Sequence, residues 1–257
     1  MTDANANPTT ALCRYSDTAV FYRERDLVEE LLAGDSDFTA TMMEHILGRA
    51  VPDTHRRVMN AILITMMEHG LTPSAIATRS VYMSAPENLQ GAVAAGLLAV
   101  GSQFVGTIEN CARLLERLVA TPDEAARKEL AGKIVANHRA TGQRVPGFGH
   151  HLHRPDDPRA LRLIEIGQDL GFDRGYLSAL EALAEAVDAE AGKHITINAT
   201  GATAALLGEM DIPVDLMRGF AVISRAAGLV AHIAEEQRRP SGRYIWNVVD
   251  KAIPYRP

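Results

Sequence analysis

The amino-acid sequence predicts an all-α protein, and three observations carry this prediction. Apolar residues recur at the three- and four-residue spacing of a helix along most of the chain. Alternation of apolar and polar residues is nearly absent, and only residues 194–198 resemble a short extended segment. No repeat of fixed period appears, which argues against a solenoid of stacked units.

The first predicted helix follows Pro52. In the stretch that begins there, apolar residues recur at four, five and eight residues from the first, namely Val58, Ile62, Leu63 and Met66. These spacings bring the side chains to one face of a helix. The segment is therefore predicted to be an amphipathic helix that packs on the core through that face.

Two later helices have predicted starts. Residues 121–124 read Thr-Pro-Asp-Glu, which combines an N-cap, a proline at the first helical position and a glutamate three residues after the cap. This pattern predicts a helix that begins there and runs through Val135. Residues 216–236 have the apolar spacing of a long helix that starts after Pro213.

Three breaks separate the helical stretches. Residues 142–158 contain closely spaced glycines and prolines that no continuous helix could accommodate. Further breaks are predicted at 192–201 and 239–242, where glycine or proline interrupts the helical pattern. Loops are therefore expected in these three places.

Length and composition are those of a globular protein. The chain has 257 residues, which at about 150 residues per domain corresponds to one or two domains. Hydrophobic residues make up 47% and charged residues 23%, so a sizeable core is expected and wholesale disorder is excluded. The net charge is −6, from 26 basic and 32 acidic residues. This balance favours no polyanionic partner, and we expect no binding to nucleic acid.

Cysteine content and apolar runs indicate the compartment. Two cysteines, Cys13 and Cys111, cannot build a disulfide framework. The polar residues 1–12 lack the basic and apolar regions of a signal peptide, and we expect them to form a disordered lead-in. The longest apolar run, 91–100, is shorter than the about 18 residues that a membrane span needs. We therefore expect a soluble, cytoplasmic protein without membrane association.

The loop at 145–159 is the most informative segment for function. It reads Val-Pro-Gly-Phe-Gly-His-His-Leu-His-Arg-Pro-Asp-Asp-Pro-Arg. Glycines next to His150 let the backbone approach a ligand closely, and Arg159 can bind a carboxylate through two parallel hydrogen bonds. From these residues alone, a ligand site and a surface loop with three solvated histidines both remain open.

A metal site is a third alternative for this loop. His151 and His153 could share one ion, and together with His150 they would suit a metal-dependent hydrolase. Neither a carboxylate nor a cysteine completes a familiar ligand spacing, however. We therefore expect no metal.

Several motifs together resemble the citrate synthase superfamily, which includes citryl-CoA lyases and the C-terminal module of ATP-citrate lyase. Pro-Gly-Phe-Gly-His at 146–150, followed by Asp-Pro-Arg at 157–159, resembles the signature of that family. Met-Glu-His-Gly at 67–70, the small-residue stretch at 96–106 and Ser-Arg-Ala-Ala-Gly-Leu-Val-Ala-His at 224–232 agree with further family segments in order and spacing. The resemblance covers most of the chain.

This resemblance implies a fold and an assembly. The family implies an all-helical homodimer, in which a large domain built from both ends of the chain flanks a smaller inserted domain. Carried onto this sequence, the large domain comprises residues 1–107 and 210–257, and the small domain comprises 108–209. The cleft would close over an oxaloacetate-like group and a CoA thioester.

The resemblance also implies roles for individual residues. His69 and His150 match the histidines that hold and polarise the reacting oxygen of the substrate. Arginines that match carboxylate-binding residues are Arg159, Arg225 and Arg239, of which the last would reach into the neighbouring subunit's site in competition with Arg243. Residues of the loop that would contact CoA are Val145, Gly147, Phe148 and Gly149. His232 fits the helix pattern and is expected to be a packed or surface residue.

Two positions depart from the family pattern. Val105 stands where citrate synthases have a histidine that holds the enol oxygen of acetyl-CoA, and the lyase branch also lacks that histidine. Thr200 stands where the family has the aspartate that moves the proton on the acetyl methyl carbon. A threonine hydroxyl has no pKa near the working pH, so it cannot replace that carboxylate in general acid–base catalysis. Glu109 is a reserve candidate for the missing acid or base.

These observations lead to two function hypotheses. The first is a citryl-CoA-lyase-like enzyme that cleaves or forms a carbon–carbon bond in a CoA-linked carboxylic acid, with a specialised substrate because of Thr200. CoA would enter as part of the substrate. The alternative is a non-catalytic protein of the same fold that binds a CoA ester or a dicarboxylate.

Overall fold

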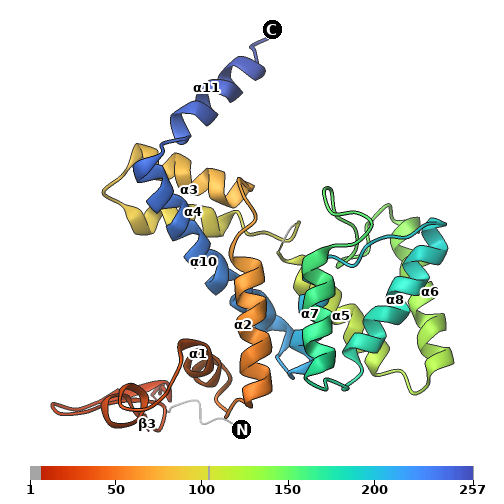
Figure 1. Cartoon of the computed structure of the whole chain (residues 1–257), viewed down its shortest axis with the longest axis horizontal. Helices are drawn as coiled ribbons and strands as arrows, with labels where there is room; N and C mark the ends of the chain where they lie inside the picture. The colour runs from red at the N-terminus through yellow and green to blue at the C-terminus, as the bar shows by residue number, and fades with distance from the viewer. Residues whose placement is uncertain (1–6, 104, 257) are drawn as a thin grey trace. The chain divides into compact units, whose positions relative to one another are not determined.

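A computed structural model describes residues 7–103 and 105–256, and it confirms the prediction of an all-α protein (Figure 1). The chain divides into two compact units, residues 7–60 and 61–256, with the boundary inside helix α2 (Asp53–Met67). The division into large and small domains at residues 107 and 209 stays a prediction.

The first unit contains a small antiparallel sheet that sequence analysis did not predict. Strands β1 (Cys13–Tyr15), β2 (Val20–Tyr22) and β3 (Arg25–Asp26) pair in that order. Each is at most three residues long, so no alternation of apolar and polar residues could reveal it. A π-helix, η1 (Leu27–Leu32), and helix α1 (Phe38–Leu47) follow.

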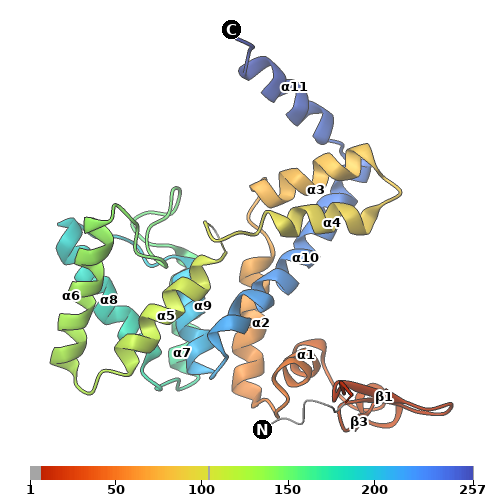
Figure 2. The same ribbon diagram turned by 180° about the vertical axis from the view of Figure 1, so that it is seen from behind.

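The second unit includes a helical hairpin that packs on a long helix. Helices α3 (Pro73–Ser84) and α4 (Leu89–Leu98) lie side by side along α10 (Val214–Arg238) in both views (Figures 1 and 2). A Cβ on Gly96 would lie 2.0 Å from Thr78 Oγ1 and 2.6 Å from a methyl group of Leu229. The missing side chain therefore permits the close packing of all three helices.

Further helices of this unit pack around α9 (Ala199–Glu209). The last nine residues of this helix, 201–209, are all buried. Its neighbours are α5 (Thr107–Val119), α7 (Pro158–Asp169) and α8 (Tyr176–Ala191). Helix α6 (Glu124–Ala140) packs on α8. Because α9 is a core helix, its N-terminal end is held firmly beside the loop before α7.

Most predicted boundaries agree with the structure. The helix after Pro52, the long helix after Pro213 and the loop before Pro158 are confirmed. The break predicted at 192–201 is shorter, since α9 already begins at Ala199. The segment at 194–198 forms one isolated bridge, between Ile197 and Phe148, rather than a strand of a sheet.

The predicted cap at Thr121 is wrong. Helix α6 begins at Glu124, and its N-cap is Asp123, whose carboxylate accepts a hydrogen bond from the backbone N–H of Ala126 at 2.8 Å. The Thr121 hydroxyl instead donates to the carbonyl of Arg117 at 3.0 Å. Thr121 thus closes the preceding helix, and the aspartate opens the next one.

The chain's C-terminal helix, α11 (Gly242–Ala252), continues beyond the end of α10 after a three-residue break (Figure 2). Among the described residues, α10 alone is long and apolar enough to cross a membrane by length and composition. Half of its most apolar window is buried inside the protein, and a core helix meets the same criteria.

Candidate active site

Four histidines gather where the turn after α2 meets the loop before α7. The ring of His150 stacks between those of His151 and His153, with centroid distances of 4.6 and 4.4 Å. The His69 ring lies edge-on to His150 at 5.4 Å. Sequence analysis placed His69 and His150 in one site, and the structure brings them together.

Arg159 links the two parts of this cluster. Its guanidinium places Nη1 3.3 Å from His69 Nδ1 and Nη2 3.4 Å from His150 Nε2. The same group donates from Nε and Nη2 to the two carboxylate oxygens of Asp157, at 3.0 and 2.8 Å. Asp157 is fully buried and caps α7, so it fixes the guanidinium in front of both imidazoles.

The charge of Asp157 is stabilised by this pairing. Burial alone would raise the pKa of its carboxyl group, but the hydrogen bonds from Arg159 and the backbone N–H of Ala199 outweigh it, and the pKa is lowered. Asp157 is therefore an ionised anchor for Arg159. Its oxygens are occupied by donors, so it is poorly suited to proton transfer.

Hydrogen bonds define the tautomer of His150. Two backbone N–H groups, those of Leu152 and His153, donate to His150 Nδ1 at 3.1 Å each. Burial, followed by the nearby His153 and Arg159, lowers the pKa of His150 to about 4. The ring is therefore neutral at pH 7 and carries its proton on Nε2. Since Arg159 Nη2 is also a donor, the two N–H groups converge on a position that an oxygen atom of a ligand could occupy.

His69 is a second neutral donor. A guanidinium can only donate, so the contact with Arg159 makes His69 Nδ1 an acceptor and leaves the proton on Nε2. Burial, together with the charges of Arg159 and Arg225, lowers the pKa of His69. Both imidazoles can therefore donate an N–H to one developing oxyanion.

Arg225 on α10 is a buried cation, and no ion pair among the described residues includes its guanidinium. It is 6% exposed, and its Nε and Nη1 atoms have no hydrogen-bond partner among the described residues. Burial lowers its pKa, and the negative charge of Glu68 opposes this shift. Because an unpaired buried guanidinium is costly, a carboxylate of a ligand is a fitting partner for it.

Thr200 does not provide a proton-transfer group. Its hydroxyl donates to the side-chain oxygen of Asn198 at 2.7 Å and accepts from the Thr107 hydroxyl at 2.9 Å. Asn198 is the N-cap of α9 and also accepts from the backbone N–H groups of Thr200 and Gly201. The hydroxyl is thus part of a helix cap. It does not act as a general acid or base.

The loop residues predicted to contact CoA are held by close backbone packing. Gly147 has φ +91°, and a Cβ there would lie 2.7 Å from Cys111 Sγ and 3.0 Å from Gly201 Cα. Phe148 is buried, whereas Val145 and Gly149 are half-buried. The backbone N–H of Gly149 donates to the Thr196 carbonyl at 2.8 Å. Their contact with CoA stays a prediction.

The reserve candidate Glu109 is already paired. Its carboxylate lies 2.5 Å from Arg218 Nη2 and is mostly buried. This ion pair occupies the carboxylate of Glu109 on the first turn of α5. Val105, one turn earlier, is buried and offers no hydrogen bond to a substrate.

The predicted site residue Arg239 lies apart in the described contacts. It is exposed at the C-terminal end of α10, and no hydrogen bond or ion pair described for residues 7–103 and 105–256 joins it to the histidines. Its competitor, Arg243, places its guanidinium over the Trp246 ring at 4.9 Å. The role of Arg239 in a neighbouring subunit's site stays a prediction.

Comparison with known sequences decides the family. A family profile described as "Citrate synthase, C-terminal domain" matches residues 7–246, which is most of the chain. The chain belongs to the citrate synthase family. The motifs around His69, His150, Arg159 and Arg225 all lie within the matched part.

Relatives in the family include enzymes of different reactions. The 2-methylcitrate synthase of Shewanella oneidensis is 29% identical over 229 residues, which cover 86% of this chain and 59% of that protein. The citrate synthase of Haloferax volcanii is 31% identical over 192 residues, which cover 71% of this chain and 48% of that protein. The chain therefore spans about half the length of these relatives.

Solved structures confirm the citrate synthase-like fold. The citryl-CoA lyase from Hydrogenobacter thermophilus matches with a TM-score of 0.83 and 30% identity, over 97% of this chain and 94% of that chain. An ATP citrate lyase from Methanosaeta concilii matches with a TM-score of 0.76 and 21% identity, over 98% of this chain and 42% of that chain. The match to the citryl-CoA lyase thus spans nearly all of both chains.

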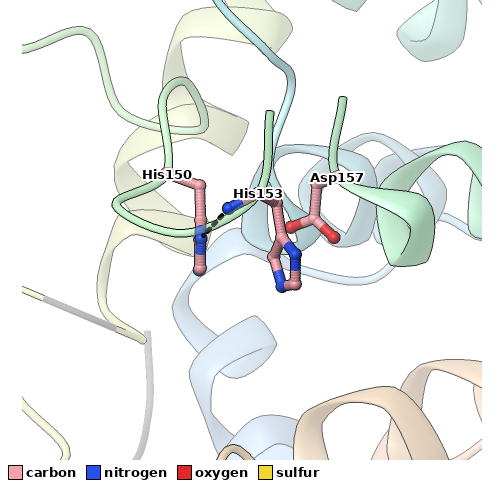
Figure 3. A group of neighbouring side chains, drawn as sticks. All are labelled: His150, His153 and Asp157. Carbon is pink, nitrogen blue, oxygen red and sulfur yellow. Dashed lines mark hydrogen bonds between the residues drawn. The ribbon is translucent and has the colours of Figure 1, made fainter. Parts of the chain in front are cut away.

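A metal ion fits the cluster poorly. Ligand atoms of His150, His153 and Asp157 lie within 4.8 Å of one another, and Figure 3 shows the two rings side by side near the carboxylate. His150 Nδ1, however, already accepts two backbone N–H groups, and both Asp157 oxygens accept from Arg159. The Arg159 cation would also repel an ion there. The hydrogen bonds thus give a physical reason for expecting no metal.

Two residues that position the site were not predicted from the sequence. Asp157 belongs to the motif at 157–159. Its place directly before Pro158 is typical of a helix N-cap, and this signal could have revealed that it caps α7. Glu68, next to His69, carries no such local signal. Its carboxylate accepts the backbone N–H groups of His69 and Gly70, at 2.8 and 2.5 Å.

Proposed function

We propose that this protein is a carbon–carbon lyase that acts on a CoA-linked carboxylic acid, in the manner of a citryl-CoA lyase. The observation that carries the proposal is the pair of neutral imidazoles, His69 and His150, that face Arg159. Two further observations support it. The Nε and Nη1 atoms of Arg225 have no hydrogen-bond partner among the described residues, and the chain matches a citryl-CoA lyase over nearly its whole length.

In the cleavage direction, the bond between the hydroxyl-bearing carbon and the α-carbon of the thioester breaks. The hydroxyl gives its proton to water and becomes a ketone, while the electron pair of the broken bond forms the thioester enolate, which then takes up a proton from water. His69 and His150 donate hydrogen bonds to the oxygen on which negative charge develops. Arg159 and Arg225 bind a carboxylate of the departing keto acid.

Thr200 limits the range of substrates in this proposal. Its hydroxyl is occupied by Asn198 and Thr107, so it supplies no proton to the enolate. General acid–base catalysis contributes about 10²–10⁴-fold in rate. A substrate whose carbanion is already stabilised, such as one between two carbonyl groups, does not need that contribution. We therefore propose a specialised acyl chain.

The substitution Thr200→Asp tests this choice. Position 200 lies in the first turn of α9, where an aspartate is favourable, so the variant should fold. We expect an unpaired charge in a partly buried position to lower the native activity, measured with a panel of hydroxyacyl- and ketoacyl-CoA thioesters. A gain of tenfold or more in citryl-CoA cleavage, with no loss of any other activity, would contradict the specialised substrate.

A second candidate function is a non-catalytic protein that binds a CoA ester or a dicarboxylate. The occupied hydroxyl of Thr200 and the ion pair of Glu109 with Arg218 favour it, because both remove a proton-transfer group. Saturable binding of a thioester without any product would support this function. Product formation with any thioester of the panel would exclude it.

A further inference from the structure

A buried arginine on α3 lies behind the turn that carries His69. Arg79 is 2% exposed, and its Nη1 donates to Glu236 at 2.8 Å and to Ser241 at 3.0 Å. Its Nη2 is paired with Glu235. Its remaining donor, Nε, points to His232 Nδ1 at 3.0 Å. Each of the three guanidinium nitrogens thus has a partner, and the hydrogen bond from Nε fixes an imidazole.

This contact determines the tautomer of His232. Because Arg79 only donates, His232 Nδ1 must accept, and the proton of the ring lies on Nε2. His232 Nε2 lies 3.0 Å from Glu68 Oε2 and 3.3 Å from Oε1. The buried ring, which is 8% exposed, therefore donates its N–H to the Glu68 carboxylate.

Glu68 connects His232 to the turn that carries His69. Its Oε1 accepts the backbone N–H groups of His69 and Gly70. Gly70 has φ +71°, the left-handed conformation that such a tight turn needs. The carboxylate itself is half exposed, with 45% of the side chain accessible. Without His232, a flexible glutamate at this position would be free to leave the turn.

A released Glu68 carboxylate has a competing partner close by. Its Oε2 lies 3.5 Å from the Cβ position of Gly228, and Arg225 is three residues earlier on the same helix. The charge of Glu68 already acts on Arg225. An ion pair between them would occupy the guanidinium that a substrate carboxylate needs.

We propose that Arg79 and His232 are positioning residues, which hold Glu68 on the His69 turn and away from Arg225. The inference rests on the proposed function in one respect, namely that His69 and Arg225 contact a substrate. The hydrogen bonds that carry it, from Arg79 through His232 and Glu68 to His69, are independent of which substrate is used.

Two substitutions at one position separate this role from mere packing. In His232→Asn, the side-chain oxygen can still accept from Arg79, but the amide is too short to reach Glu68. In His232→Gln, the longer side chain can donate to Glu68 in place of Nε2. Since both keep Arg79 partnered, both variants should fold. A matched control is Ser241→Ala, which removes a different contact of Arg79 and leaves the His232–Glu68 contact in place.

The first measurement does not depend on turnover. Amide signals of His69 and Gly70 are followed by NMR, with hydrogen exchange, in selectively labelled full-length protein. We expect His232→Asn to shift both signals and to speed their exchange by tenfold or more. His232→Gln should restore both to within threefold of the wild type, and Ser241→Ala should leave them unchanged while lowering the melting temperature.

The second measurement uses oxaloacetate as a probe of Arg225. We expect His232→Asn to weaken the binding of oxaloacetate and to lower kcat on any active thioester by tenfold or more. His232→Gln should restore both the binding and kcat. Unchanged amide signals in His232→Asn, or equal effects of Ser241→Ala, would overturn the inference. If the wild type turns over no thioester, the proposed function fails, while the amide signals still decide the inference.

Discussion

At the scale of single residues, the site combines neutral imidazoles with fixed cations. His150 shows how this arises, because its Nδ1 is occupied by the backbone of its own loop and its Nε2–H faces Arg159. Burial of the rings, together with the charge of Arg159, lowers the pKa of His69 and of His150, so both imidazoles are neutral at pH 7. Such a site stabilises negative charge on oxygen without first having to lose a proton.

Arg159 and Arg225, the two arginines proposed to bind a carboxylate, should respond differently to substitution. Arg225 has no partner for Nε and Nη1 among the residues that the structure describes. Arg225→Gln should therefore weaken oxaloacetate binding by roughly 1.5–3 kcal/mol with no loss of stability. Arg159→Gln should weaken binding and also lower the melting temperature, because it leaves the buried carboxylate of Asp157 unpaired.

Calorimetric titration and thermal unfolding of the two variants check this contrast. Unaltered affinity in both variants would remove both arginines from the site. Equal loss of stability in both variants would mean that Arg225 has a structural partner.

The lowered pKa of His150 makes stability depend on pH. Its pKa is about 4 in the folded protein against an ordinary value of 6.5. As the pH falls from 6.5 towards 4, the unfolded chain takes up a proton that folded His150 does not, so the free energy of unfolding decreases. His69, whose pKa is also lowered, adds an effect of the same sign.

The variant His150→Asn tests this dependence, since its side-chain oxygen can still accept the backbone N–H groups of the loop. Urea midpoints are measured between pH 7.5 and pH 4.5. We expect the wild type to lose more stability than the variant over this range. Parallel curves for the two proteins would show that His150 titrates normally.

At the scale of elements, the active-site loop is held by contacts between small residues. A Cβ on Gly201, at the start of α9, would lie 2.5 Å from the carbonyl oxygen of Gly147. Because that neighbour is backbone, Gly201→Ala must displace the loop, at a cost of about 1–3 kcal/mol. On the exposed face of α6, Gly132 has open space around its Cβ position.

Gly132→Ala is therefore the matched control, and it should stabilise the protein by up to about 1 kcal/mol. Denaturant unfolding of both variants gives the two values. A Gly201→Ala variant as stable as the wild type would show that the loop adapts freely.

Helices and motif residues could be predicted from sequence because their signals are local. The apolar face of α2, with Val58 and Ile62 fully buried, follows from spacing alone. The three short strands gave no such signal, and Asp123 rather than Thr121 caps α6 because both neighbouring helices compete for this segment.

Long-range contacts explain what sequence analysis could not find in the site. His232 and Glu68 are 164 residues apart, and Arg79 and His232 are 153 residues apart. Only the fold brings them together. His69, His150, Arg159 and Arg225 were found because each lies in a motif whose spacing is preserved, whereas the environment of Thr200 became apparent only from its hydrogen bonds.

At the scale of the whole molecule, we expect a homodimer. The last helix, α11, exposes large apolar side chains, including Tyr244, Trp246 and Ile253. A second copy of the chain would cover them and would bring Arg239, at the preceding helix end, near another subunit. Light scattering at micromolar concentration should give the mass of two chains.

The chain has a single tryptophan, so fluorescence reports on this helix directly. Trp246 is 55% exposed in the single chain, and its emission should move to longer wavelength when a dimer dissociates on dilution. A monomeric mass together with emission that does not change on dilution would contradict the homodimer.

In the proposed reaction, this citrate synthase family member breaks a carbon–carbon bond, and His150 stabilises the oxygen on which charge develops. The most direct test is a product-resolved turnover measurement on the thioester that gives the highest rate, with the wild type and His150→Ala. We predict that the wild type releases an acyl-CoA and a keto acid in equal amounts. His150→Ala should lower kcat at least a hundredfold while changing the half-saturating concentration much less. Hydrolysis to free CoA without carbon–carbon cleavage would contradict the proposed reaction, and equal kcat in the variant would contradict the role of His150.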